Sequence, residues 1–329
     1  MRYINKTYIR KVLKTGVLFA SVFLFVSGCT DKKNAEKDMI AEYETSVYDA
    51  SLYEGALFSE GLCVSSKDVL REDCKVDEGL HAAALFDLEK KDVLYSTRIH
   101  EHLAPASTTK ILTAYVALNY GNLDDKVIVS EKALDLEAGS SVCNLKVGDT
   151  LTLKDLLYGL MLRSGNDSAV AIAEHIGGSI DAFVDMMNEE AWKLGATNSH
   201  FTNPHGLHHE EHYTTAYDLY LMFNQCLKNE TFVEIINTPS YQADIMQADG
   251  SVRSDTWKTS NAYLSEDVPM PEHVTVIGGK TGTTDQAGRC LILYNQNDSK
   301  KPFISIVMGA PDKTVLYQDM TALMASIPQ

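Results

Sequence analysis

The stretch Pro105-Ala106-Ser107-Thr108-Thr109-Lys110-Ile111-Leu112 places a serine and a lysine three residues apart. On a helix such residues lie one above the other, so the amine of Lys110 can reach the hydroxyl of Ser107. A serine hydroxyl is a weak nucleophile until a base takes its proton, and a lysine with a depressed pKa is one such base. The residues behind the pair supply an apolar stripe that predicts a buried helix: Ile111, Leu112, Tyr115, Val116, Ala117 and Leu118.

A second motif, Ser164-Gly165-Asn166, lies 57 residues after Ser107. It separates a predicted helix over residues 153–162 from another apolar-periodic run that begins at Ala169. A turn of this kind between two helices can present a hydroxyl and a carboxamide side by side. Glycine and asparagine also end helices without any catalytic role. The turn therefore indicates a catalytic site only together with the other motifs.

The third motif, Lys280-Thr281-Gly282, lies between the strand-like runs 274–277 and 291–294. A glycine there lets a substrate backbone approach the strand closely. The lysine and the threonine hydroxyl can hold an anionic group. A glycine-rich hairpin with an exposed lysine is the alternative if this motif is taken alone.

The remaining pattern indicates a mixed α/β chain. Residues 81–87 and 92–96 read as strands joined by a charged turn, and residues 127–129 and 151–153 as short extended segments. Residues 303–308 form an apolar run typical of a central strand, and residues 314–327 predict a closing amphipathic helix.

The three motifs together resemble those of serine D-alanyl-D-alanine carboxypeptidases of peptidase family S11, the low-molecular-mass penicillin-binding proteins. The resemblance runs from about Gly79 to the carboxyl end. It implies a β-lactamase/transpeptidase-like α/β fold, with an antiparallel sheet flanked by helices and a mainly helical subdomain that carries Ser-Gly-Asn. The stretches that carry it are 105–110, 164–166, 195–207, 212–218 and 278–290.

The resemblance also implies roles. Ser107 attacks the carbonyl between two terminal D-alanines of a peptidoglycan stem peptide, Lys110 is the acylation base, Ser164 relays a proton to the leaving group, and Asn166 orients Lys110 and the substrate amide. Lys280, Thr281 and Thr283 hold the terminal carboxylate beside Gly282, and the N–H groups of Ser107 and Thr283 form an oxyanion hole. β-Lactams acylate Ser107, and neither a metal nor an organic cofactor is needed. Three other polar residues are expected to be structural: His205, His212 and Asp218.

Three rival interpretations differ in plausibility. A class A β-lactamase has an aspartate where this chain has Gly165, and a deacylating glutamate in a later loop, whereas residues 197–207 contain no acid. A D,D-endopeptidase, which cuts crosslinks, shares every motif and differs in pocket shape. A non-catalytic wall-binding lipoprotein would not be expected to retain all the motif side chains.

The charge of the chain excludes some partners. The formal charge is −16, and the first 28 residues carry five basic residues and no acid. Without them 24 basic and 45 acidic residues remain, a net charge of −21. So strong a negative charge argues against nucleic acid as a partner and against electrostatic adhesion to anionic lipid.

The amino terminus predicts export. Residues 2–14 are basic, residues 16–28 are largely apolar, and Val26-Ser27-Gly28-Cys29 resembles a bacterial lipobox. We expect residues 1–28 to be a lipoprotein signal peptide and Cys29 to carry the lipid. The rest of the chain would then lie outside the cytoplasmic membrane, tethered to its outer face. An uncleaved signal anchor is the alternative.

Three regions follow from these patterns. Residues 29–76 are expected to be a tether and leading segment, and residues 77–329 the penicillin-binding D,D-peptidase domain. The 47 residues after Gly282 are too few for the carboxyl-terminal β domain that many relatives carry, so none is expected. Cys63 and Cys74 can form a disulfide or remain free thiols, a choice that one sequence leaves open. Three more cysteines are expected to be buried thiols: Cys143, Cys226 and Cys290.

Overall fold

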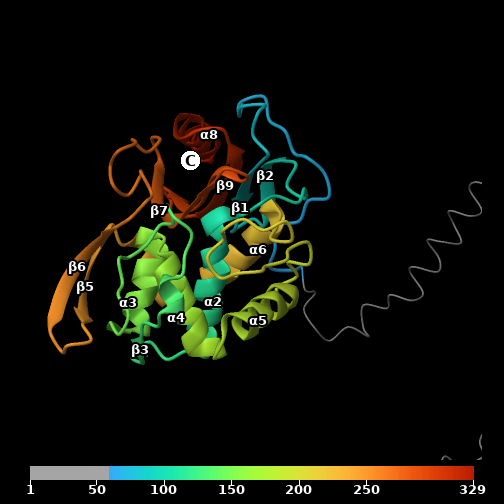
Figure 1. The fold of residues 1–329 in the computed structure, drawn as a ribbon. Coiled ribbons are helices and arrows are strands. Elements are labelled where there is room, and N and C mark those ends of the chain that lie inside the picture. Colours follow the sequence, from blue (N-terminus) through green and yellow to red (C-terminus); the bar gives the residue numbers. More distant parts are fainter. Residues whose placement is uncertain (1–58) are drawn as a thin grey trace, which may run out of the picture. The chain divides into compact units, whose positions relative to one another are not determined.

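The computed structural model describes residues 59–329 (Figure 1). The predicted signal peptide, Cys29 and most of the predicted tether lie outside these residues. None of the helices in the described part is long and apolar enough to cross a membrane.

The centre of the domain is a five-stranded antiparallel sheet with the strand order β2-β1-β9-β8-β7 (Figure 1). The central strand β9 is almost wholly buried, as the apolar run at 303–308 predicted. Strand β7, which carries Lys280-Thr281-Gly282, is an edge strand of this sheet. The bounds are β1 Ala82–Asp87, β2 Asp92–Thr97, β7 Val274–Thr284, β8 Gly288–Asn297 and β9 Pro302–Ala310.

The sheet separates two hydrophobic cores. Side chains alternate between the faces of a strand, and in β1 Phe86 belongs to one core and Leu85 to the other. The last helix, α8 (Lys313–Ala325), covers one face with Leu316, Met320 and Leu323. The other face packs against the helical part of the domain, so both faces of the central strands are buried.

The helical part is built around α2 (Lys110–Tyr120), which Figure 1 shows in the middle of the other helices. Seven of its 11 residues are buried, because α4, α5 and α6 pack on it from several sides. Side-chain caps start several of these helices, among them Thr152 for α3 and Thr215 for α6. The bounds are α3 Leu153–Tyr158, α4 Asn166–Gly177, α5 Ile180–Lys193, α6 Ala216–Cys226 and α7 Glu230–Asn237.

A second, four-stranded antiparallel sheet has the order β3-β4-β5-β6. Its first two strands match the predicted short extended segments. The hairpin of β5 and β6 projects from the body (Figure 1), and the sequence pattern had not indicated it. Ala243, Ile245 and Trp257 are the buried residues of that hairpin. Apolar residues alternate over a short stretch of β5, but β6 has only Val252 and Trp257 as apolar residues, so the hairpin lacks a matching pattern in both strands. The bounds are β3 Lys126–Ile128, β4 Thr150–Thr152, β5 Ser240–Met246 and β6 Val252–Lys258.

The segment before β1 packs on the domain. Val69 pairs with Ser96 of β2 through two backbone hydrogen bonds, and the N–H of Cys63 donates to the Tyr220 hydroxyl at 2.9 Å. Cys63 lies in the core on one side of the sheet and Cys74 in the core on the other side. Both are free thiols, which answers the question that the sequence left open. The three other described cysteines are buried free thiols, as predicted.

Candidate active site

The serine lies in a tight turn rather than in the α-helix itself. Residues Ala106–Thr109 form a 3₁₀ turn, and α2 begins at Lys110. In a 3₁₀ turn the side chains at i and i+3 eclipse, which brings the Lys110 Nζ to 2.9 Å from the Ser107 Oγ. Ala106 has a φ of 48°, an unfavourable value for a residue with a Cβ. Strained backbone of this kind is typical of functional sites.

The Lys110 amine is fully buried and has three hydrogen-bond partners. Besides Ser107 they are the Asn166 Oδ1 at 2.8 Å and the backbone carbonyl of His205 at 2.7 Å. A carbonyl oxygen only accepts hydrogen bonds, so these two partners take the two N–H bonds of a neutral amine. The lone pair of that amine then faces the Ser107 hydroxyl. Burial and, after it, the charge of Lys280 hold the pKa of Lys110 well below its usual value.

The Ser-Gly-Asn turn joins a π-helical turn, Gly159–Arg163, to the start of α4. Ser164 has a left-handed φ of 60°, which turns its side chain out of the helix direction. Gly165 has no room for a side chain, because a Cβ there would lie 2.5 Å from the Cys143 Sγ. The aspartate that class A β-lactamases carry at this position therefore does not fit this packing.

Lys280 approaches the serine turn from the opposite wall. Its side chain is 1% exposed, and its Nζ donates to the Ser164 Oγ at 3.0 Å and to the Thr281 carbonyl at 2.8 Å. Burial lowers the pKa of Lys280 to about 7. The Thr281 hydroxyl lies 2.6 Å from that of Ser260, and the Arg289 guanidinium donates to the Thr283 hydroxyl at 3.2 Å. This wall therefore offers two basic side chains and three hydroxyls.

Gly282 permits the close approach of β7 to the serine turn. A Cβ at this residue would lie 3.0 Å from the Pro105 carbonyl oxygen and 3.1 Å from the backbone nitrogen of Ser107. Because β7 is an edge strand, an extended peptide can pair with it. The cleft alongside has a volume of about 460 Å³. Its lining residues are Ser107, Gly139, Ser141, Arg163, Ser164, Ser260, Thr281, Gly282, Thr283, Arg289, Cys290, Lys313, Leu316 and Tyr317.

The structure thus brings all eight predicted site residues of the described part to one place. The lipidation candidate Cys29 lies outside the described residues. No group of three or more His, Cys, Asp or Glu side chains within residues 59–329 could hold a metal ion. The sequence did not reveal the His205 carbonyl, because a backbone acceptor leaves no residue-type signal.

The loop over residues 202–207 supplies that carbonyl, and His212 helps to hold the loop. The Thr202 N–H donates to the His212 Nδ1 at 3.0 Å, so the Nε2–H of the neutral ring donates to the Thr109 hydroxyl at 2.9 Å. Burial lowers the pKa of His212 to about 3, which keeps the ring neutral. Asp218 lies on α6, where it accepts hydrogen bonds from Asn198 and Ser199. These contacts agree with the structural roles expected from the sequence.

Gly206→Ala is expected to lower the free energy of unfolding by about 3 kcal/mol. Gly206 has a φ of 89°, and a Cβ there would lie 1.8 Å from the Ala106 carbonyl oxygen. The matched control is Gly250→Ala, because Gly250 has a φ of 82° and no atom within 4 Å of its Cβ position. That variant should lose only the free energy that a Cβ costs in a left-handed backbone conformation, about 1 kcal/mol. Urea denaturation measures both values, and equal losses would contradict the predicted contact with the serine turn.

Comparison with known proteins gives the same family throughout. A family model described as Peptidase_S11, D-alanyl-D-alanine carboxypeptidase, matches residues 75–312. The D-alanyl-D-alanine carboxypeptidase DacF of Bacillus subtilis (strain 168) is 36% identical over 234 residues, which are 70% of this chain and 57% of that protein. The D-alanyl-D-alanine carboxypeptidase of Streptomyces sp. (strain K15) is 34% identical over 70% of this chain and 81% of its own length. The match thus spans less than two thirds of the Bacillus relative.

Solved structures agree in fold. The crystal structure of the Streptomyces K15 DD-transpeptidase superimposes with a TM-score of 0.71 at 32% identity, over 77% of this chain and 98% of that chain. The D-alanyl-D-alanine carboxypeptidase DacD from Francisella tularensis gives a TM-score of 0.67 at 25% identity, over 80% of this chain and 73% of that one. The predicted fold class is therefore confirmed. With a family match over most of its length and relatives above 30% identity, the chain belongs to the S11 family of D-alanyl-D-alanine carboxypeptidases.

Proposed function

We propose that this chain is a serine D,D-carboxypeptidase that removes the terminal D-alanine from peptidoglycan stem pentapeptides. The observation that carries the proposal is the environment of Lys110. Its buried amine has two acceptor-only partners and the Ser107 hydroxyl as the third. This arrangement suits a neutral amine that takes a proton from serine.

The first half of the reaction acylates Ser107. Lys110 takes the hydroxyl proton while the Oγ attacks the carbonyl carbon between the two D-alanines. The negative charge that develops on the carbonyl oxygen is stabilised by the N–H groups of Ser107 and Thr283. Each such donor is commonly worth about 3 kcal/mol in the transition state. Asn166 keeps Lys110 in place and can also bind the substrate amide.

The leaving alanine needs a proton on its nitrogen and a partner for its carboxylate. Ser164 lies 3.0 Å from the Lys280 amine and can give its hydroxyl proton to the departing nitrogen. The proton that Lys110 took from Ser107 then restores the Ser164 hydroxyl, so that Lys110 is neutral again and Ser164 is unchanged. Lys280 with the Thr281 and Thr283 hydroxyls would hold the terminal carboxylate, a contact that an exopeptidase requires. The C–N bond breaks, D-alanine leaves, and water then hydrolyses the ester on Ser107.

β-Lactams are expected to acylate the same serine, because their strained amide resembles the D-alanyl-D-alanine bond. The lining of the cleft contains no aspartate or glutamate. A carboxylate that could activate water for fast deacylation is therefore not among the residues of the 59–329 part that line the cleft around the ester. We expect the penicilloyl-enzyme to persist, in contrast to that of a class A β-lactamase.

The pH dependence of kcat/KM is expected to be bell-shaped. Activity needs Lys110 in its neutral form, and this form disappears as the pH falls through the lowered pKa of Lys110. Activity also needs Lys280 in its protonated form, and this form disappears as the pH rises through about 7. Because kcat/KM reports the free enzyme, the alkaline limb should lie near pH 7 and move to higher pH in kcat, when the substrate carboxylate stabilises the ammonium. Release of D-alanine at varied pH measures both, and an unchanged alkaline limb in Lys280→Gln would contradict this assignment.

A D,D-endopeptidase is the second candidate. The lining of the cleft includes Lys313, Leu316 and Tyr317 of α8 besides the Thr281–Thr283 stretch, which leaves room for a leaving group larger than alanine. Crosslinked muropeptide dimers and stem pentapeptides, compared at equal concentration, distinguish the two activities.

We further propose that the protein is exported and held at the outer face of the cytoplasmic membrane by a lipid on Cys29. In this proposal residues 1–28 are the signal peptide, residues 29–76 the tether and leading segment, and residues 77–329 the catalytic domain. The lipobox-like sequence supports it. Metabolic labelling with a fatty acid tests it: a Cys29→Ala protein that still incorporates label and stays in the membrane would refute it.

The direct test of the activity uses the full-length chain in mild detergent with a diacetyl-Lys-D-Ala-D-Ala peptide. Free D-alanine should appear with the wild type and not with Ser107→Ala. Penicillin labelling without release of D-alanine would refute the carboxypeptidase and indicate an enzyme that acts on larger peptidoglycan fragments. Absence of both would refute the catalytic proposal.

A further inference from the structure

The catalytic cleft opens beside a smaller hollow that the reaction described above does not use. This hollow has a volume of about 290 Å³. Arg163, which directly precedes Ser164, lines both the cleft and the hollow and so lies between them. The other lining residues are Cys143, Asn144, Asp255, Thr256, Trp257 and Lys258.

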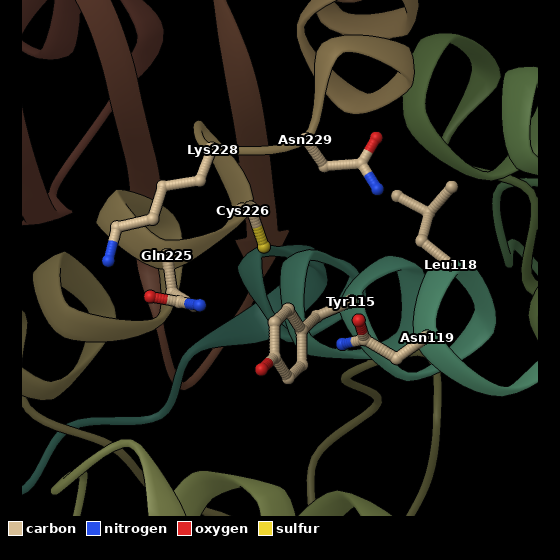
Figure 2. A pocket seen from close by; sticks show the side chains of 7 residues that line it. All are labelled: Tyr115, Leu118, Asn119, Gln225, Cys226, Lys228 and Asn229. Carbon is tan, nitrogen blue, oxygen red and sulfur yellow. The ribbon is translucent and has the colours of Figure 1, made fainter.

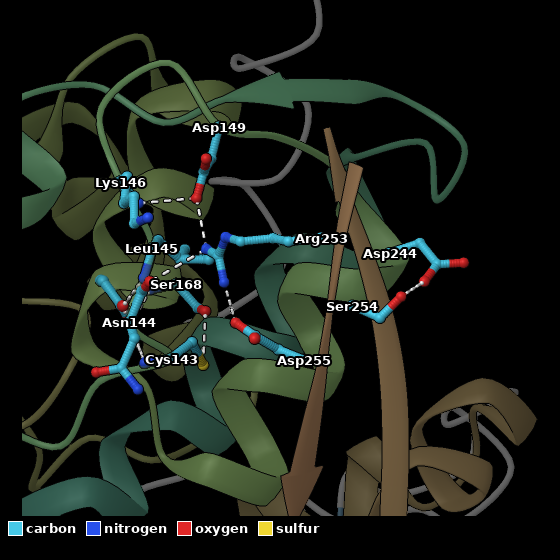
Figure 3. Close-up of polar contacts among 11 residues, drawn as sticks. Cys143, Asn144, Leu145, Lys146, Asp149, Ser168, Asp244, Arg253, Ser254 and Asp255 are labelled. Atoms are coloured by element: carbon cyan, nitrogen blue, oxygen red, sulfur yellow. Dashed lines mark hydrogen bonds and ion pairs between the residues drawn. The ribbon is translucent and has the colours of Figure 1, made fainter. Parts of the chain in front are cut away.

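The hollow has an excess of positive charge within an acidic protein. Asp255, the one acid among the described residues that line it, pairs with Arg253, which also binds the buried Asp149 at 2.6 Å (Figure 3). Arg163 and Lys258 have exposed side chains, and neither forms an ion pair or a side-chain hydrogen bond with another residue of the described part. Two cations are therefore available to an anion in the hollow beside the cleft.

The wall of the hollow is fixed. Arg253 donates to the Asn144 carbonyl at 3.1 Å, which ties the 143–145 loop to β6 (Figure 3). Trp257 also lines the hollow and is only 3% exposed. The hollow thus combines two unpaired cations with a fixed wall, a set that suits a carboxylate.

We propose that this hollow is a second anion subsite, in which Arg163 and Lys258 bind a carboxylate of the stem peptide itself. The inference rests on the proposed function. The leaving D-alanine has one carboxylate, and Lys280, Thr281 and Thr283 already account for it. A further carboxylate must therefore belong to the part of the peptide that acylates Ser107. In a peptidoglycan stem this group is the free carboxylate of a γ-linked D-glutamate or that of a dicarboxylic third residue.

The test compares stem pentapeptides that differ only in one carboxylate or its amide. One pair carries γ-linked D-glutamate or D-isoglutamine before acetyl-lysine, and the other carries diaminopimelate with its side-chain carboxylate free or amidated. The full-length protein should show a kcat/KM about fivefold higher for the acid in one of the pairs. The pair that responds identifies the carboxylate. Arg163→Gln should bring the acid-to-amide ratio close to one, and Lys258→Gln should lower it.

The matched control removes a lysine charge at another hollow. Lys228 lies on the turn between α6 and α7, where it lines a pocket with Tyr115, Asn119 and Gln225 (Figure 2). That pocket shares no lining residue with the cleft, so Lys228→Gln should leave the acid-to-amide ratio as in the wild type. Equal rates for acid and amide in the wild type, or a ratio that both Arg163→Gln and Lys258→Gln preserve, would overturn the subsite. Failure to release D-alanine from any peptide would refute the proposed function instead.

Discussion

Lys110→Arg is expected to slow the acylation of Ser107 by roughly 10³-fold. Arginine does not lose its proton in proteins, so it would place a positive charge where Lys110 is neutral, and it cannot accept the proton of the serine hydroxyl. The buried Lys110 amine also has its two N–H partners in fixed places, the Asn166 side chain and the His205 carbonyl. The planar guanidinium cannot reproduce that geometry. Stopped-flow measurement with a fluorescent penicillin gives the acylation rate without any contribution from deacylation.

The control for this variant is Lys154→Arg, at an exposed lysine on α3. It should leave the acylation rate within about twofold of the wild type, because an exposed ion pair contributes little. Thermal unfolding of both variants shows whether the domain remains folded. An acylation rate for Lys110→Arg within tenfold of the wild type would mean that another group is the base.

Lys280→Gln is expected to lower kcat/KM for peptides that end in a free carboxylate by roughly 10²-fold. The loss has two causes, since Lys280 would bind the terminal carboxylate and also donates to the Ser164 Oγ at 3.0 Å. Glutamine keeps a donor at this wall but removes the charge. The measurement is the release of D-alanine under conditions where the substrate concentration lies far below KM.

A substrate with a terminal carboxamide separates these two causes. The carboxamide has no charge for Lys280 to bind, so the wild type should prefer the free acid strongly, and Lys280→Gln should lose most of that preference. If the variant lost activity equally on the acid and the amide, the principal role of Lys280 would be toward Ser164. If the preference for the acid persisted, Arg289 beside Thr283 would be the better candidate for carboxylate recognition.

Much of the fold could be predicted because its signals are local. The apolar run at 303–308 marks a strand buried on both faces, and the spacing of Ser107 and Lys110 brings them together whether the turn is 3₁₀ or α-helical. The hairpin of β5 and β6 was missed because β5 alternates over only a few residues and β6 has two apolar residues five positions apart, Val252 and Trp257. Its pairing depends on the partner strand rather than on its own pattern.

Part of the site could not be predicted from local sequence patterns. The His205 carbonyl reaches Lys110 through a loop 95 residues further along the chain, which only the folded structure brings near. Arg163 stands next to a motif that was recognised, yet its place between the cleft and a second hollow depends on the position of β6. The free state of Cys63 and Cys74 likewise follows from the sheet that separates them. The side-chain types in the motifs indicated the chemistry. The distances between segments that lie far apart in the sequence could be obtained only from the structure.

The nucleophile is identified most directly by the mass of the intact protein after incubation with benzylpenicillin, followed by peptide mapping. We expect one penicilloyl group per chain, located on Ser107, absent from Ser107→Ala, and still present long after free penicillin is removed. An adduct on another residue, or no adduct on a folded wild-type protein, would contradict the assignment of Ser107 as the nucleophile. Rapid loss of the adduct would instead contradict the expectation that the cleft lacks a group for fast deacylation.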